Sequence, residues 1–127
     1  MGERSSLRWI LLAAVILTST AACDSTYPAQ RAYLRAEGGL GYDCGVSCRY
    51  QGEARNSGTG CALRVRGVTR IHDGSGREIG RDEWSLDPAR RVRQGETFLF
   101  EGCCFSLGQV NFARSSRTEI SWDDTSC

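Results

Sequence analysis

The sequence predicts an all-β fold, a β-sandwich of about seven short strands preceded by a cleaved signal helix. Apolar and polar residues alternate over residues 61–73, glycine-rich turns recur at nearly regular spacing, and the chain beyond residue 23 has no sustained helical periodicity. The two prolines do not interrupt any predicted strand. Short strands joined by such turns are typical of a sandwich of two antiparallel sheets.

The clearest predicted strand lies at residues 61–73. One face of this strand is apolar or small, and the other face is mostly basic. The first face holds Leu63, Val65, Gly67, Thr69 and Ile71, and the second holds Arg64, Arg66, Val68, Arg70 and His72. The sequence Asp-Gly-Ser-Gly at residues 73–76 then predicts a hairpin turn to a return strand at residues 77–86.

The remaining elements are predicted from turn residues and short apolar runs. We expect residues 24–36 to lead into a first strand or a helical turn, and residues 37–47, which hold four glycines, to form a loop. Further strands are predicted at residues 48–55, 97–105 and 117–122, with turns at 56–60 and 92–96 and a break at Asp87-Pro88.

The first 22 residues have the order of a secretory signal peptide. Arg4 and Arg8 precede an unbroken apolar run at residues 9–17, and small residues follow at 18–22. The apolar run is too short to cross a bilayer, which needs about 20 residues. A buried core helix is the alternative interpretation. We therefore expect a signal peptide at 1–22, a lipid-anchored tether at 23–36 and a disulfide-stabilised β-sandwich domain at 37–127.

The sequence Thr20-Ala21-Ala22-Cys23 resembles the lipobox of bacterial lipoproteins, although leucine is usual where Thr20 stands. The resemblance implies that Cys23 is acylated and becomes the first residue of the mature protein. Several acyl chains on one residue give stable membrane anchoring. The expected location is therefore a membrane, with the domain facing the periplasm or the cell exterior. Ordinary signal-peptidase cleavage after Ala22 is the alternative.

The seven cysteines fit this assignment, because an odd number in an exported protein needs an explanation. Lipid on Cys23 leaves six cysteines, which predict three disulfides worth about 2–4 kcal/mol each. The six are Cys44, Cys48, Cys61, Cys103, Cys104 and Cys127. They allow about 15 pairings.

Three features of the cysteine spacing narrow these pairings. Cys103 and Cys104 are adjacent, so on a regular strand they face opposite sides and seek different partners. Cys44 and Cys48 bond to each other only if their segment turns. A disulfide at Cys127 would pin the C-terminus.

A metal site is the competing interpretation of the cysteines, but the chain has one histidine and no Cys-x-x-Cys pair, so we expect no metal and no cofactor.

The charge balance argues against a nucleic-acid-binding protein. The chain has 16 Arg and 15 acidic residues, of which two Arg and one acid lie in residues 1–22. The mature part therefore carries 14 charges of each sign and is neutral. Nucleic-acid-binding domains normally have a clear basic excess.

Two groups of polar residues are candidate sites. Arg64, Arg66 and Arg70 could bind anionic lipid headgroups, a sugar acid or an acidic partner protein. The alternative is a solvated sheet face on which Glu53, Glu78 or Glu83 supplies cross-strand partners. His72 precedes Asp73, and an aspartate can orient a catalytic histidine. The alternative for His72 is a half-exposed strand residue beside a turn.

The aromatic residues form a third candidate site. They could stack on carbohydrate rings, or they could form the core of the sandwich. The residues concerned are Trp84, Phe98, Phe100, Phe105 and Trp122.

Residues from about Tyr50 to Phe105 resemble the FxLYD type of immunoglobulin-like domain, which occurs in exported bacterial proteins and lipoproteins. The similarity lies in residues 52–60 (Gly-Glu-Ala-Arg-Asn-Ser-Gly-Thr-Gly), in residues 65–76 and in residues 94–100 (Gln-Gly-Glu-Thr-Phe-Leu-Phe). Residues 69–73, at the position of the five-residue signature, keep only its final Asp. The resemblance implies an immunoglobulin-like sandwich and implies no catalytic residue.

These observations favour a lipid-anchored cell-envelope protein with a non-catalytic binding or accessory domain. The membrane, through lipid on Cys23, is one expected partner, and an envelope protein is another. The alternatives are a structural subunit of an envelope complex and an envelope enzyme that uses His72. The sequence specifies neither the ligand nor the physiological process.

Overall fold

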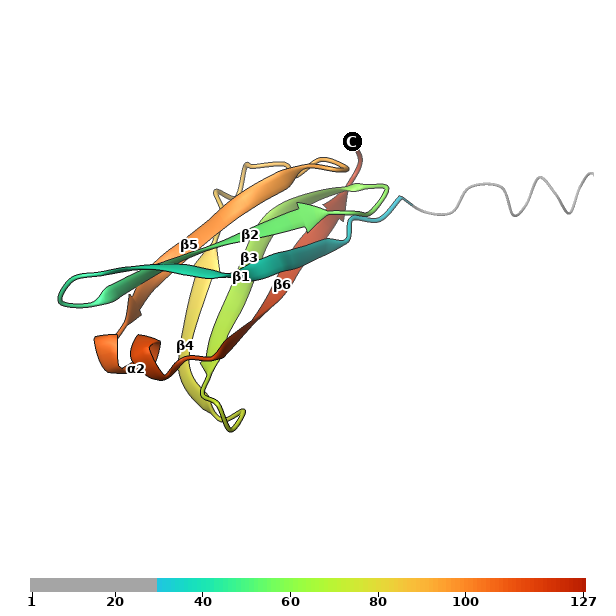
Figure 1. The fold of residues 1–127 in the computed structure, drawn as a ribbon. Coiled ribbons are helices and arrows are strands. Elements are labelled where there is room, and N and C mark those ends of the chain that lie inside the picture. Colours follow the sequence, from blue (N-terminus) through green and yellow to red (C-terminus); the bar gives the residue numbers. More distant parts are fainter. Residues whose placement is uncertain (1–29) are drawn as a thin grey trace, which may run out of the picture.

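Two three-stranded antiparallel sheets stack face to face in the computed structural model, which describes residues 30–127 (Figure 1). The first sheet has the order β1-β2-β5 and contains β1 (Leu34–Cys44), β2 (Cys48–Asn56) and β5 (Thr97–Phe105). The second has the order β4-β3-β6 and contains β3 (Cys61–His72), β4 (Glu78–Ser85) and β6 (Ser115–Thr125). The predicted β-sandwich is confirmed, with six strands where about seven were expected. The predicted signal helix lies outside the described residues.

The alternation along β3 is confirmed, and it places the core. From Val65 onward the odd-numbered residues of β3 are buried, and the even-numbered residues are exposed or half-buried. Gly67 is needed on the buried face, because a Cβ there would overlap the Trp84 ring. The buried apolar side chains of both sheets meet in one cluster: Ala32, Leu34, Cys48, Tyr50, Ala54, Ala62, Val65, Ile71, Trp84, Val92, Phe98, Phe100 and Phe105.

The prediction of a loop at residues 37–47 is wrong, because β1 runs through most of this segment. Its pairing with β2 shifts register between Glu37 and Gly41. Gly38 stands at this shift with φ of 71°, a conformation that glycine adopts at little cost. The glycines therefore absorb a bulge within a strand and do not end it.

One helix, α2 (Leu107–Phe112), connects β5 to β6, and the sequence did not predict it. Six residues are too few to display a helical repeat. The local signal is a capping box, in which Ser106 and Gln109 each bond to the other's backbone N–H, at 3.1 and 2.7 Å. Within residues 30–127 no helix is long and apolar enough to cross a membrane.

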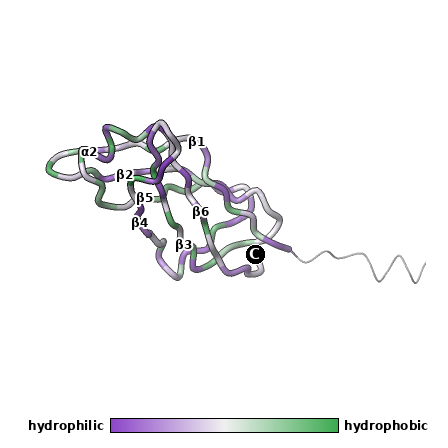
Figure 2. Tube along the Cα trace, turned by 90° about the horizontal axis from the view of Figure 1, so that it is seen from below, coloured by the Kyte–Doolittle hydropathy of each residue, from purple (hydrophilic) through white to green (hydrophobic). Residues whose placement is uncertain are grey.

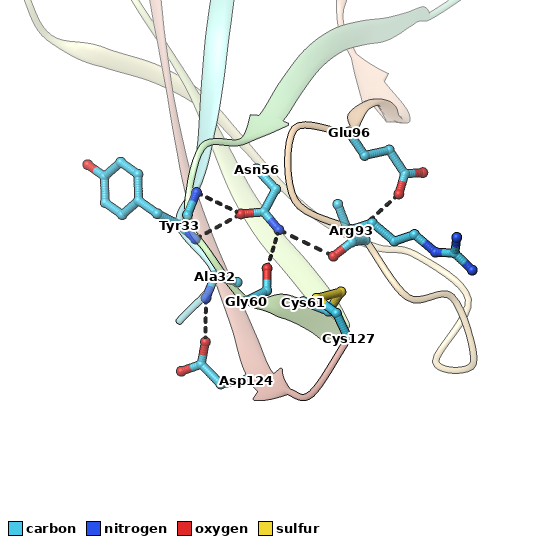
Figure 3. The surroundings of a disulfide bond; sticks show 11 residues. Ala32, Tyr33, Asn56, Gly60, Cys61, Arg93, Glu96, Asp124 and Cys127 are labelled. Atoms are coloured by element: carbon cyan, nitrogen blue, oxygen red, sulfur yellow. Dashed lines mark hydrogen bonds between the residues drawn. A yellow bond between two sulfur atoms is a disulfide. The ribbon is translucent and has the colours of Figure 1, made fainter. Parts of the chain in front are cut away.

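The sandwich has two distinct ends. We call one the terminal end: here Ala32 donates its backbone N–H to Asp124 at 2.8 Å, and a disulfide joins Cys61 to Cys127 (Figures 1 and 3). We call the other the distal end: it holds the β1–β2 turn and α2. These two features are neighbours, because Cys48 at the start of β2 pairs with Phe105 at the end of β5.

Asn56 organises the terminal end (Figure 3). Its side chain is fully buried and makes four hydrogen bonds. The Oδ1 atom accepts from the backbone N–H groups of Tyr33 and Gly58, both at 3.0 Å. The Nδ2 atom donates to the carbonyls of Gly60 at 2.9 Å and Val92 at 3.3 Å. One amide thus ties the turn predicted at residues 56–60 to two other chain segments, those of Tyr33 and Val92.

Candidate functional site

The basic face predicted for the strand at 61–73 exists, on the outer surface of the sheet β4-β3-β6. The strand register sets the side chains of this face in rows, because directly opposite residues of antiparallel strands share a face. Arg66 lies between Ser85 and Ser121. Val68 lies between Glu83 and Glu119, and Arg70 between Arg81 and Arg117.

Most arginines of this face are paired with carboxylates. Arg70 contacts Glu78 at 2.9 Å and Glu119 at 3.1 Å. Arg64 pairs with Asp123, and its hydrogen bond is the main reason that the pKa of Asp123 lies below the usual range. Glu78 is therefore confirmed as a cross-strand partner.

The other two predicted acidic partners do not contact the arginines of β3, although Glu83 lies on the same face, beside Val68. Glu83 pairs with Arg81 at 3.4 Å. The expectation for Glu53 is wrong, because Glu53 lies on β2 in the other sheet, opposite Leu99. Most of the charge that the sequence presents as a basic face is therefore neutralised within the sheet.

The pairing of β3 with β6 is irregular at Arg64. The φ of Arg64 is 50°, and the pairing shifts register between Leu63 and Arg66. This is a β-bulge, which interrupts the hydrogen-bonded pairing of the two strands beside Arg64. Arg66 donates to the Arg64 carbonyl at 2.8 Å and forms no ion pair among residues 30–127. The structure therefore does not bring the three arginines into one cationic cluster.

The Asp73 carboxylate accepts hydrogen bonds from its own turn and not from His72. Its Oδ1 atom accepts from the Ser75 hydroxyl at 2.7 Å and from the backbone N–H groups of Ser75 and Arg77, both at 3.0 Å. These bonds, the Ser75 hydroxyl first, hold the pKa of Asp73 below its usual range. His72 is half-buried at the end of β3, opposite Glu78 and Ser115. In the described structure the two residues do not form the hydrogen-bonded pair that the enzyme interpretation requires.

The aromatic residues form the core, not a carbohydrate platform. Trp84 stacks on Phe100 from the opposite sheet, with ring centroids 4.6 Å apart and planes inclined by 9°. Phe98 and Phe105 are also buried. Trp122 is half-buried and packs against the same cluster. The surface that these rings would offer to a sugar is therefore already used between the sheets.

Comparison with known proteins adds no relative. No family model, curated protein or solved structure matches this chain. The similarity to the FxLYD family stays a prediction. Among residues 30–127, no three side chains of the His, Cys, Asp and Glu types gather as metal ligands would.

Three disulfides are present, and they pair all six cysteines of the described chain. Cys44 bonds to Cys48 because the segment between β1 and β2 turns tightly, as this pairing requires. Cys127 bonds to Cys61, so the last residue is pinned as expected.

The expectation of different partners for Cys103 and Cys104 is wrong, because they bond to each other. The peptide bond that joins them is cis. The expectation assumed a regular strand. In the structure the β2–β5 register skips from Cys103 to Phe105, so Cys104 is an extra residue opposite no partner. Alternation across a strand does not hold at such a bulge.

The distal end exposes most of the large apolar side chains that face solvent. Of the six such residues in the described chain, four lie there. Val46, at the tip of the Cys44–Cys48 turn, is fully exposed, and Phe112 on α2 is 69% exposed. Tyr42 and Leu107 are the other two. In Figure 2 the loop at this end is partly green, the colour of hydrophobic residues.

Large apolar side chains that remain exposed at one end of a domain are candidates for contact with a partner. This end was not predicted from the sequence, although the valine between two cysteines in Cys-Gly-Val-Ser-Cys is a signal for it.

Proposed function

We propose that this chain is an exported lipoprotein, anchored through Cys23, whose β-sandwich is a non-catalytic binding or accessory module of the cell envelope. The pairing of the cysteines carries the proposal. Residues 30–127 hold six cysteines in three disulfides, which leaves Cys23 as the odd residue. Three disulfides in a small domain fit an oxidising compartment, and a single remaining cysteine in a lipobox-like sequence fits acylation.

The layout of the sandwich fits an anchored domain. Gln30 is seven residues beyond Cys23, and those residues span about 25 Å at most. β1 alone, with 11 residues, extends over about 36 Å. The described chain enters at the terminal end (Figure 1). An anchor at Cys23 would therefore hold the terminal end near the membrane and leave the distal end free to meet a partner.

The distal end is the part of the domain best suited to binding. Val46 and Phe112 are presented on a disulfide-closed turn and a capped helix, so little flexibility is lost when they are buried. Apolar side chains in such positions add nothing to the core, so binding to an envelope protein is the function that their exposure favours.

Membrane partition tests the anchor. The full-length protein, expressed in a bacterium that processes lipoproteins, is expected to enter the detergent phase of membrane extracts. Cys23→Ser is expected to be released as a soluble protein that still forms its three disulfides. Equal detergent partition of the two proteins would contradict lipid anchoring at Cys23.

Site-specific photocrosslinking tests the binding end. A photoreactive residue at position 46 in intact cells is expected to give a discrete adduct. Position 99 is the matched control, because Leu99 is also exposed but lies on the face of the β1-β2-β5 sheet. Adducts at neither position, or equally at both, would contradict a binding role for the distal end.

A further inference from the structure

The three disulfides differ in what they contribute to the fold. A disulfide restricts the unfolded chain more when it closes a longer loop. Cys61–Cys127 joins residues 66 positions apart, and Cys44–Cys48 joins residues four apart. Cys103–Cys104 joins neighbours, so it closes almost no loop. The last disulfide therefore has little structural reason to be maintained.

The same disulfide is also the most accessible. Cys61 and Cys48 are fully buried, so each of the other two bridges has one sulfur inside the domain. Cys103 and Cys104 are both exposed. They lie at the end of β5, close to the distal end. Exposed disulfides are the ones that exchange readily with external thiols.

A cation stands beside this disulfide. Arg49 on β2 lies directly opposite Cys103 in the strand register. The two residues line one surface hollow of about 210 Å³, together with Glu101 and Gly102. Asp43 lies on the other side of Arg49 in the register, yet Arg49 forms no ion pair within residues 30–127. An unpaired guanidinium next to a cysteine stabilises the thiolate.

We propose that Cys103 and Cys104 form a reversible thiol–disulfide exchange site that accepts two electrons from a dithiol. A thiolate of the dithiol attacks the Cys104 sulfur, the Cys103–Cys104 bond breaks, and Cys103 leaves as a thiolate beside Arg49. The second thiol of the dithiol then attacks the dithiol sulfur that is bonded to Cys104, the bond between that sulfur and Cys104 breaks, and Cys104 leaves as a thiolate. The dithiol is oxidised to a disulfide, its two protons pass to the departing sulfurs, and this chain is left with two thiols.

The inference goes beyond the proposed function, since it requires neither lipid on Cys23 nor a partner at Val46. The natural reductant would be a dithiol protein that reaches the distal end. A small dithiol such as dithiothreitol supplies the same chemistry and serves as the probe.

Partial reduction of the full mature protein, followed by alkylation and tryptic mapping, tests the site. Cleavage after arginine places each disulfide in its own set of peptides. Residues 94–114 carry Cys103 and Cys104, residues 36–49 carry Cys44 and Cys48, and Cys61 and Cys127 fall in 56–64 and 118–127. The expected result is alkylation of the 94–114 peptide at least about tenfold faster than of Cys61 and Cys127.

Two outcomes would overturn the proposal. One is reduction of Cys103–Cys104 no faster than reduction of Cys61–Cys127. The other is a 94–114 peptide that is cross-linked to another peptide in the oxidised protein, since the two cysteines would then have separate partners.

A pair of variants tests the role of Arg49. Arg49→Gln is expected to slow the reduction of Cys103–Cys104 by about threefold, because exchange rates follow the pKa of the leaving thiol. Arg55→Gln is the matched control, since Arg55 lies on the same face of β2 opposite Thr97, away from the disulfide. Thermal unfolding establishes that both variants fold. Equal reduction rates in the two variants would overturn the assignment of Arg49.

Discussion

The hydroxyl of Tyr50 on β2 donates a hydrogen bond of 2.6 Å to Oδ2 of Asp82 on β4, and so joins the two sheets through the interior. Gly102 leaves the space for this contact, because a Cβ there would overlap both side chains. Thr69 adds further polar contacts inside the sandwich. Its hydroxyl accepts a hydrogen bond from the Trp84 indole N–H at 3.0 Å and shares another with the Thr118 hydroxyl at 3.0 Å. The sandwich is thus held by specific polar contacts as well as by its apolar core.

Tyr50→Phe is expected to destabilise the domain by about 1–3 kcal/mol, because the substitution leaves the part-buried carboxylate of Asp82 without its donor. In a domain of this size that corresponds to a loss of roughly 4–8 °C in Tm for each kcal/mol. Thermal unfolding measures the difference. Tyr33→Phe is the control, since Tyr33 is exposed. Equal Tm values for the two variants would show that the hydroxyl of Tyr50 does not stabilise the folded domain.

The stability of the domain is expected to fall as the pH rises above 10. Burial first, and then the hydrogen bond to Asp82, raise the pKa of Tyr50 well above its ordinary value of 10.0. A raised pKa stabilises the folded state below the unfolded pKa, and this stabilisation is lost as the pH rises toward the folded pKa. Absorbance titration should show one tyrosine that ionises only on unfolding, and Tyr50→Phe should remove it. A Tyr50 that titrates normally in the folded protein would contradict the buried geometry.

Asn56→Ala is expected to cost about 3 kcal/mol, because it leaves two part-buried backbone N–H groups and two buried carbonyls without the side-chain partner. Chemical denaturation of the purified domain measures the loss. Asn111→Ala is the matched control, since Asn111 is exposed on α2. A loss no larger than that of the control would mean that the terminal end is organised by other contacts.

Arg64→Gly is expected to be more stable than Arg64→Ala by about 1 kcal/mol. Both substitutions remove the exposed ion pair with Asp123, but only glycine adopts a φ of 50° without steric cost. The comparison therefore isolates the backbone conformation from the charge. Equal stability in chemical denaturation would contradict the left-handed conformation at position 64.

The sequence predicted the strand in which buried and exposed residues alternate regularly, and it missed the segments in which this alternation is absent or interrupted. Period-two alternation over β3 identified its buried face, because every second side chain of a regular strand points the same way. β1 was missed because its glycines carry no side chain that could show a pattern. The pairing of Cys103 with Cys104 was missed for a related reason, since a bulge removes the alternation on which the prediction depended.

The candidate sites divide in the same way. The basic face of β3 was visible in the sequence. The ion pair of its Arg70 with Glu119 was not, because that contact joins strands that are distant along the chain. The exposure of Val46 and Phe112 at one end, and the position of Arg49 opposite Cys103, likewise depend on how β2 pairs with β5. Single-sequence patterns do not carry such register information.

The proposed function depends on lipid at Cys23 and on the pairing of the remaining six cysteines. Intact mass spectrometry of the protein from a membrane fraction, without reduction, tests both parts at once. The predicted species begins at Cys23, carries the added mass of acyl chains, and takes up no thiol-alkylating reagent. A species without added acyl mass that begins at another residue would contradict lipid at Cys23, and a species that reacts with the reagent would contradict the pairing of the six cysteines.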